Sequence, residues 1–268
     1  MSKRMEAVFA ALAENGRKAL IPYISAGDPL PEQCVNVMHA LVAGGANILE
    51  LGIPFSDPAA DGETIQLANE RALARGVSLP DVLAMAAEFR QQDSATPIVL
   101  MGYLNSFERR GFAQSMQAAA QSGVDAVILV DCPIEALPDY AADLSANNMT
   151  AIQLLAPTTG AERQHKIIAA AEGFIYYVSL RGVTGKQEAQ AQAIRHAVED
   201  IKTQTKTPVC IGFGIRDGAT AKAMAAFADG VIIGSALVAK LWQAAQEGQD
   251  VSQAARTFVE TIRQALDN

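Results

Sequence analysis

Short apolar runs alternate with alanine-rich segments of helical periodicity along most of this chain. Eight runs rich in Val, Ile and Leu predict strands, which begin near Ala19, Ile48, Pro97, Ala126, Thr150, Phe174, Val209 and Gly230. The segments between them predict helices at residues 31–42, 64–75, 79–91, 111–121, 136–146, 161–171, 189–203 and 219–227. Further helices are predicted at residues 5–13, before the first strand, and at residues 252–265, after the last one.

This alternation favours one closed sheet. Strands that are apolar on both faces are typical of a parallel sheet covered by helices, and eight such strands close a (β/α)8 barrel. No linker rich in Gly, Pro or Ser divides residues 1–268, so we expect a single TIM-barrel domain with an extra N-terminal helix. An open doubly wound sheet is the alternative, although no GxGxxG motif follows the first strand to support a dinucleotide site.

Composition narrows the possible ligands. The net charge of -8 and the isoelectric point near 4.9 argue against nucleic acid or an anionic membrane as a partner. A bound phosphate would therefore be held mainly by backbone amides. No stretch is long and apolar enough to span a membrane and the first residues lack a secretory signal, so we expect a cytoplasmic protein.

Cysteine and histidine are few and scattered. Their spacing matches neither a disulfide framework nor a zinc site, and we expect no metal in this chain. These residues are Cys34, Cys132, Cys210, His39, His165 and His196.

The segment LELGIPFSDPAADG, residues 49–62, carries two acids in different surroundings. Glu50 lies inside an apolar run, and alternation along the second strand directs it into the barrel beside Ile48. Burial should raise the pKa of its carboxyl group, whereas Asp61, on the polar loop that follows, should stay ionised. Two carboxyl groups separated in this way can both give and take protons. The alternative is a hydrogen-bonded strand-end residue at Glu50 and a turn or cap at Asp61.

Other residues at the strand ends are interpreted as structural. Asp57 and Asp131 are expected to be turn or cap residues. Tyr103 and Tyr176 end the third and sixth strands, where a tyrosine more often belongs to the core but can line a pocket.

Glycine-bearing turns follow the last three strands. They are RGVTG at residues 181–185, GFG at residues 212–214 and Gly234-Ser235 at the start of a helical segment. Glycine allows close approach of the backbone to an anion, and phosphate sites of barrels are commonly built after strands 7 and 8. Any one of these turns could equally be a tight turn or an N-cap without a ligand, but the three together favour a phosphate site.

Motifs along nearly the whole chain resemble those of the tryptophan synthase alpha subunit family. They are PYISAGDP (22–29), LELGIPFSDPAADG (49–62), IQLANERAL (65–73), LMGYLN (100–105), YYVSLRGVTG (176–185), GFGIRDG (212–218) and GSALV (234–238). The resemblance implies reversible aldol cleavage of indole-3-glycerol phosphate to indole and glyceraldehyde 3-phosphate. It implies that Glu50 protonates carbon 3 of the indole ring and assists deprotonation of the glycerol hydroxyl, while Asp61 holds the indole N–H.

The resemblance also implies the substrate contacts. The expected apolar lining for the indole is Tyr23, Met101, Tyr176, Phe213 and Ile232. The expected phosphate cradle is Gly185, Gly214, Gly234 and Ser235. Thr184 lies in the loop after the sixth strand, which in the family closes over the substrate and orders Asp61.

Family members work with a beta subunit that carries pyridoxal phosphate and receives the indole through a tunnel. The resemblance therefore implies an alpha2beta2 assembly, no cofactor in this chain, and a docking face near the loops after strands 2 and 6. Ile53, Pro54 and Phe55 either contribute to that face or fold back on the barrel.

Three positions depart from the family's usual pattern. Ala59 replaces a larger aliphatic residue, and Glu63 and Ser106 replace prolines. Two functions remain as alternatives to the lyase: another phosphosugar enzyme on the same barrel, such as an isomerase, or a non-catalytic phosphate-binding barrel that activates a partner.

Overall fold

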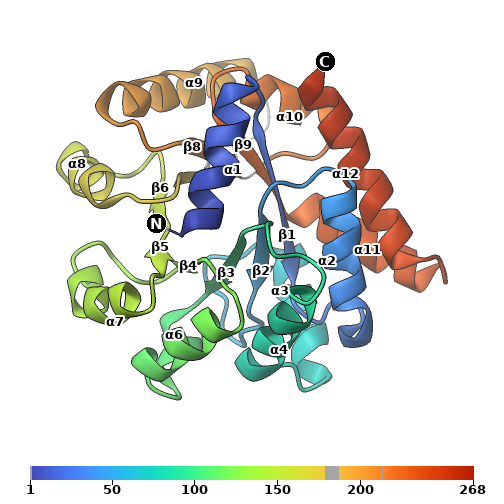
Figure 1. The fold of residues 1–268 in the computed structure, drawn as a ribbon. Coiled ribbons are helices and arrows are strands. Elements are labelled where there is room, and N and C mark those ends of the chain that lie inside the picture. The colour runs from blue at the N-terminus through green and yellow to red at the C-terminus, as the bar shows by residue number, and fades with distance from the viewer. Residues whose placement is uncertain (1, 179–186, 213) are drawn as a thin grey trace.

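The computed structural model describes residues 2–178, 187–212 and 214–268, and its elements follow the predicted alternation (Figure 1). The strands are β1 Ala19–Ser25, β2 Leu49–Gly52, β3 Ile98–Gly102, β4 Ala126–Leu129, β5 Thr150–Ala151, β6 Gln153–Leu155, β7 Ile175–Val178, β8 Val209–Gly212 and β9 Gly230–Ile233. The α-helices are α1 Lys3–Glu14, α2 Cys34–Ala43, α3 Glu63–Ala74, α4 Leu79–Phe89, α5 Leu104–Glu108, α6 Phe112–Gln121, α7 Ala141–Ala146, α8 Ala161–Ala170, α9 Gln187–Gln204, α10 Gly218–Ala225, α11 Ser235–Gln246 and α12 Val251–Asp267. Two 3-10 turns are η1 Pro31–Gln33 and η2 Leu137–Asp139.

The strands form a parallel sheet, and its two end strands, β5 and β6, both belong to the fifth predicted run, which closes the barrel. Within the described residues their order is β5-β4-β3-β2-β1-β9-β8-β7-β6. β5 pairs with β4 and β6 pairs with β7, while the amide of Ile152 between them donates to the carbonyl of Val127 at 2.8 Å. β5 and β6 are thus two halves of one run, and the eight predicted strands form the predicted barrel. The extra helix before β1 is also confirmed.

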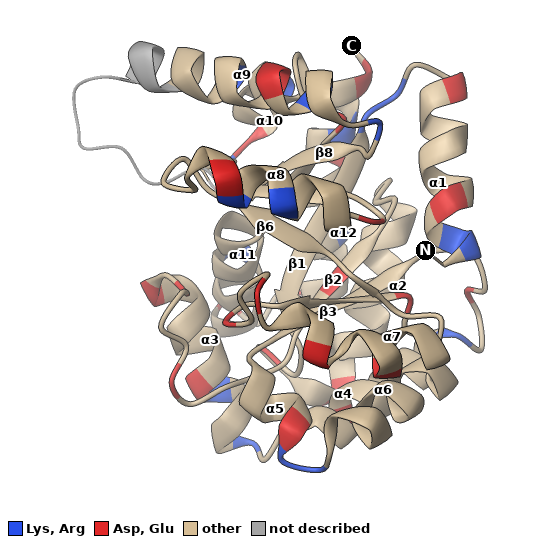
Figure 2. Cartoon of the chain, turned by 90° about the vertical axis from the view of Figure 1, so that its left-hand side faces the viewer, with Lys and Arg blue, Asp and Glu red and all other residues tan. Residues whose placement is uncertain are grey.

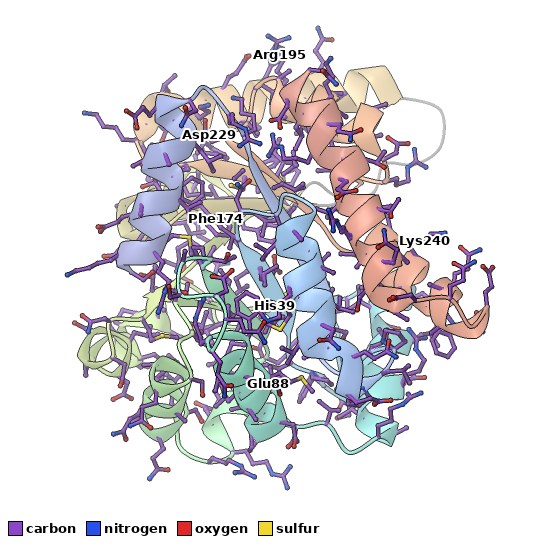
Figure 3. All side chains as sticks on the ribbon, turned by 45° about the vertical axis from the view of Figure 1, so that its right-hand side comes forward. His39, Glu88, Phe174, Arg195, Asp229 and Lys240 are labelled. Carbon is purple, nitrogen blue, oxygen red and sulfur yellow. The ribbon has the colours of Figure 1, made fainter. Side chains whose placement is uncertain are left out.

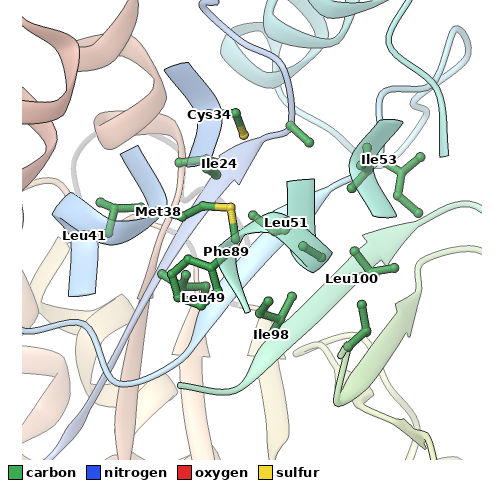
Figure 4. Packing of buried hydrophobic residues seen from close by; sticks show 14 of the residues in the cluster. Ile24, Cys34, Met38, Leu41, Leu49, Leu51, Ile53, Phe89, Ile98 and Leu100 are labelled. Carbon is green, nitrogen blue, oxygen red and sulfur yellow. The ribbon is translucent and has the colours of Figure 1, made fainter. Parts of the chain in front are cut away.

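Strand side chains divide between the barrel interior and the helix-covered outside. Figure 4 shows the outward Leu49 and Leu51 of β2 packed with the residues of β1, β3 and α2, in a cluster that also contains Phe89 of α4. A second cluster inside the barrel contains Ile48, Val99 and Phe174, the last labelled in Figure 3. Met5 and Leu12 of α1 join this inner cluster, so α1 covers the amino-terminal end of the barrel.

One buried carboxylate at that amino-terminal end is fully partnered. The side chain of Asp125, just before β4, is 1% exposed. Its oxygens accept hydrogen bonds from Arg90 Nη2 at 2.9 Å, Arg4 Nη1 at 3.1 Å and Ser2 Oγ at 2.8 Å. The amide of Ile98 donates to it as well, at 2.9 Å. Asp125 therefore ties α1 and α4 to the start of β3.

The helix predicted at residues 136–146 is divided into η2 and the shorter α7, and two further helices were predicted incompletely or not at all. The pattern did not predict α5, a five-residue helix whose first amide, that of Leu104, donates to Asp131 Oδ1 at 2.7 Å. Asp131 follows β4, whereas α5 follows β3. The bond between them confirms that Asp131 has a structural role. For α11 only a helix start at Ser235 was predicted, whereas the helix continues to Gln246.

Surface charges are mixed. In the view of Figure 2, acidic and basic residues are scattered over helices and loops of the cartoon. Among the described helices, none has the length and apolar character needed to cross a bilayer.

Candidate active site at the carboxyl ends of the strands

Glu50 is a buried acid inside the barrel. It lies on β2 in register with Tyr23 of β1 and Val99 of β3, and it is 1% exposed. Neither carboxyl oxygen has a hydrogen-bond partner among the residues that the structure describes. Burial, followed by the nearby charge of Asp61, raises the pKa of Glu50 to about 8. Glu50 therefore holds a proton at neutral pH, as the sequence predicts.

Asp61 comes from the loop between β2 and α3 and reaches the same end of the barrel. Its carboxylate accepts a hydrogen bond from Asn69 Nδ2 on α3 at 3.4 Å. Burial raises the pKa of Asp61 to about 6, although hydrogen bonds from Asn69 and Tyr103 act in the opposite direction. Although it lies on a polar loop, Asp61 is therefore partly buried in the folded chain. Asp61 is still mainly ionised at pH 7.

Tyr103, which sequence analysis favoured as a core residue, holds the loop that carries Asp61. Its hydroxyl accepts a hydrogen bond from the amide of Ala60 at 2.9 Å. Its ring stacks on Phe55 with 4.9 Å between centroids. Burial raises its pKa to about 12, so Tyr103 stays protonated. Its place at the carboxyl end of β3 was the available indication of a role at the site.

The loop after β2 also folds back on the barrel. Ile53 is 4% exposed, Pro54 is buried, and Phe55 is half-buried against Tyr103. Of the two possibilities left open by the sequence, the structure favours packing against the barrel for these three residues. Asp57 accepts a hydrogen bond from Ser56 Oγ at 2.6 Å within a turn of this loop, which agrees with its predicted structural role.

Two tyrosines extend over the barrel interior next to Glu50. A β-carbon at Gly52 would overlap the ring of Tyr23, and one at Gly212 would overlap the ring of Tyr176. Glycine at these two strand ends therefore makes room for the aromatic rings. The charges of Glu50 and Asp61 add to burial in raising the pKa of both tyrosines, which places both phenols near the two acids.

The described apolar residues predicted to contact the indole gather around these groups. Met101 packs against both the inner cluster and Tyr23, and Ile232 lies in the inner cluster with Tyr176. The predicted contacts Phe213 and Thr184, and the phosphate residue Gly185, lie outside the described residues.

Further apolar side chains, which sequence analysis did not select, complete this lining. Val130 at the end of β4 and Leu154 of β6 pack on the inner cluster beside Ile128. Val130 and Leu154 also line a cavity of about 480 Å³ between the loops that follow β4 and β6. The same period-2 alternation that places Glu50 inside the barrel was the signal for these residues.

The predicted phosphate residues that the structure describes lie at the start of α11 and after β8. Gly234 is the N-cap of α11 and offers no side-chain acceptor to the amides of its first turn, whereas Asp217 caps α10 by accepting from the amide of Thr220 at 2.8 Å. The first turn of α11, beginning at the exposed Ser235, thus presents amides that its N-cap residue leaves uncapped, as in an anion site at a helix N-terminus. Gly214 is exposed and has a φ of 80°, a conformation that favours glycine.

Metal ligands do not gather here. Within the part of the chain that the structure describes, no three His, Cys, Asp or Glu side chains come together in a way that could hold a metal ion.

Comparison with known proteins agrees with this geometry. A family model described as the tryptophan synthase alpha chain matches residues 9–267. The chain belongs to this family. The tryptophan synthase alpha chains of Herminiimonas arsenicoxydans and Cupriavidus metallidurans are each 50% identical to it over 264 residues, covering 98% of this chain and 99% of theirs.

Solved structures of the family share the fold. The tryptophan synthase alpha subunit of Legionella pneumophila superimposes with a TM-score of 0.93 at 41% identity, with full coverage of both chains. A chain from the Mycobacterium tuberculosis tryptophan synthase, in an open form, superimposes with a TM-score of 0.88 at 31% identity, again over both whole chains. Membership in the tryptophan synthase alpha chain family is therefore supported by sequence and by fold.

Proposed function

We propose that this chain catalyses the reversible aldol cleavage of indole-3-glycerol phosphate to indole and glyceraldehyde 3-phosphate, with Glu50 and Asp61 as its catalytic residues. The lyase activity follows from membership in the tryptophan synthase alpha chain family. The assignment of the two residues rests on one observation. A buried carboxyl group, which has no hydrogen-bond partner among the described residues, shares the barrel mouth with a second, mainly ionised carboxylate.

The first step is protonation of the indole ring. Glu50, protonated at neutral pH, donates its proton to carbon 3, and the ring becomes a cationic indolenine. Asp61 accepts a hydrogen bond from the ring N–H and stabilises the positive charge that develops on the nitrogen. An ionised group in a site that largely excludes water stabilises such a charge more effectively than it would in bulk water.

The second step breaks the carbon–carbon bond. Glu50, now a carboxylate, takes the proton of the glycerol hydroxyl next to carbon 3. The oxygen forms the aldehyde carbonyl, and the bonding electrons return to the ring and neutralise the indolenine as indole. Glu50 ends the cycle protonated, so one residue serves as acid and then as base.

Substrate binding divides between two parts of the site. Tyr23, Met101, Tyr176 and Ile232, with Val130 and Leu154, offer an apolar surface for the indole. The amides at the start of α11 and the backbone near Gly214 offer donors for the phosphate. Thr184 and Gly185 enter this proposal through the family resemblance alone.

We also infer a partner for this chain. The family works with a beta subunit, and we propose an alpha2beta2 assembly in which the partner carries the pyridoxal phosphate. This chain would then supply indole without a cofactor of its own. A single domain over residues 1–268 and a cytoplasmic location stay predictions.

An indole-release assay on the purified chain tests this proposal. Glu50→Gln and Asp61→Asn should each lower kcat/KM by about 10²- to 10⁴-fold, because each removes a group that acts on the reacting atoms. Glu63→Gln, an exposed acid two residues after Asp61, is the matched control and should change the rate by less than about threefold.

Other outcomes contradict the proposal. Full activity in both variants would remove the assigned mechanism. Isomerised phosphosugar as the product would indicate another phosphosugar enzyme. A chain that releases no indole but accelerates an added beta subunit would indicate a non-catalytic activator.

A further inference from the structure

A buried pair of polar residues lies behind Asp61. Ser25, at the end of β1, is 1% exposed, and Asn69, on α3, is 2% exposed. Ser25 Oγ donates a hydrogen bond to Asn69 Oδ1 at 2.5 Å, and Asn69 Nδ2 donates to Asp61 Oδ2 at 3.4 Å. The three side chains form a chain of hydrogen bonds from the barrel wall to the carboxylate.

The Asp61 carboxylate and the Ser25 hydroxyl together favour one orientation of the Asn69 amide. An amide side chain presents either its oxygen or its NH2 group, and the two orientations have nearly the same shape. With its oxygen engaged by the Ser25 hydroxyl, Asn69 turns its NH2 group toward the carboxylate. The reverse orientation would place the amide oxygen against a negative charge.

The helix that carries Asn69 is held in place. Asn69 lies among Ile65, Ala68 and Ala72, which are 6% exposed or less. Two residues further on, Arg71 makes a two-pronged ion pair with the buried Asp28, at 2.6 and 2.9 Å. The guanidinium of Arg71 also stacks 4.1 Å from the ring centroid of Trp242 on α11. Asn69 is thus a fixed donor on a fixed helix.

We propose that Asn69 is a positioning residue that aims the Asp61 carboxylate and keeps it ionised, and that Ser25 orients Asn69 for this task. The inference rests on the proposed function, since it gives Asn69 and Ser25 a role through Asp61. Neither residue was selected by sequence analysis, and neither touches the reacting atoms in the proposed mechanism.

The surroundings of Asp61 explain why such a donor matters. Among the described residues, the titratable groups that interact with it are Glu50 on β2, Tyr23 on β1, Tyr103 after β3 and Tyr176 on β7. None of these four is a cation. Burial raises the pKa of Asp61, and the hydrogen bonds from Asn69 and Tyr103 oppose this change.

The experiment measures the titration of Asp61 directly. Carboxyl-carbon NMR of aspartate-labelled chain, with the Asp61 resonance assigned by its loss in Asp61→Asn, gives the titration midpoint without any need for activity. In Asn69→Ala the midpoint should rise by roughly one pH unit, because a donor to the charged form is lost. In Asn69→Asp, which keeps the shape and replaces the donor by an acceptor, it should rise further.

Kinetics give a second measurement. Asn69→Ala should lower kcat for indole release at pH 7 by roughly 10-fold or more, with a KM change below about threefold, and should move the acid limb of the pH profile upward. Ser25→Ala should show the same pattern more weakly. Ser25→Thr, which keeps the hydroxyl, should restore the parent profile.

The matched control is Asn47→Ala at the opposite end of the barrel, where Asn47 Oδ1 accepts from the amide of Leu20 at 2.9 Å. It should lower stability and leave the Asp61 midpoint unchanged. The inference is overturned if both Asn69 variants leave the midpoint and the acid limb where the parent has them. An active Asp61→Asn variant would instead count against the proposed function. The NMR midpoint of Asp61 in the Asn69 variants would still show whether Asn69 keeps this carboxylate ionised.

Discussion

Each end of the barrel contains a buried carboxyl group, and the two groups differ in their hydrogen-bond partners. At the amino-terminal end, Asp125 accepts hydrogen bonds from two arginines, a serine and a backbone amide. At the carboxyl-terminal end, Glu50 is equally buried, and its carboxyl group has no hydrogen-bond partner in the described part of the chain. The sequence supplies 21 lysine and arginine residues, so cations are not scarce. The fold thus pairs the buried acid at one end, and at the other end it leaves Glu50, the proton donor of the proposed mechanism, without a hydrogen-bond partner among the described residues.

The largest expected effect of this difference is on activity. Glu50→Gln should lower kcat/KM for indole release by about 10²- to 10⁴-fold, because an amide cannot give or take the proton. Asp125→Asn should change kcat by less than about fivefold in the fraction that folds, since Asp125 lies at the other end of the barrel. A steady-state assay measures kcat for both variants, and circular dichroism gives the folded fraction by which each rate is divided. A comparable loss in both variants would contradict the contrast.

The next effect is on stability at the amino-terminal end. Asp125→Ala should lower the free energy of unfolding by about 3 to 5 kcal/mol, because it deprives Arg90, 10% exposed, of the carboxylate at 2.9 Å and leaves only the more distant Asp93, at 3.9 Å, nearby. Urea denaturation at pH 7 measures this change. As a reference, Ser115→Ala removes a buried hydroxyl that donates to the Phe107 carbonyl at 2.7 Å and should cost only about 1 kcal/mol. Equal costs for the two variants would contradict the structural role of Asp125.

At the carboxyl-terminal end, stability should change in the other direction. Burial raises the pKa of Glu50 from its ordinary 4.5 to about 8. The folded chain thus keeps a proton that the unfolded chain loses between these pH values, and the parent loses stability as pH rises through about 8. Glu50→Gln should be more stable than the parent at pH 8 by on the order of 2 kcal/mol, and the gain should shrink toward pH 5. A gain in stability that does not depend on pH would contradict its attribution to the raised pKa of Glu50.

The smallest effect is on the pH profile of the parent chain. Asp61 must lose its proton and Glu50 must keep one, so kcat/KM should rise with pH through about 6 and fall through about 8. Because the two acids interact, these values belong to the pair. Replacing Asp61 by Asn should remove the acid limb from the residual activity. A profile that still rises through pH 6 in that variant would assign the limb to another group.

Much of the fold and part of the site could be predicted from local patterns. Apolar runs and helical periodicity are short-range properties, and all eight runs form strands near the predicted positions. The inward direction of Glu50 followed from its neighbours Leu49 and Leu51, which lie outside. The pairing partners of polar groups could not be predicted in this way. Tyr103 reaches Ala60 across 43 residues, and Ser25 reaches Asn69 across 44.

The amino-acid sequence by itself determined the strand and helix order, the acid buried inside the second strand, and the motifs that identify the family. Only the tertiary structure decided that Asp61 is partly buried, that Tyr103 holds its loop, and that Asn69, bound by Ser25, donates to it. The physical reason is distance along the chain. Periodicity and burial depend on neighbours in sequence, whereas the hydrogen bonds and desolvation that tune a carboxylate come from strands and loops brought together only when the barrel closes.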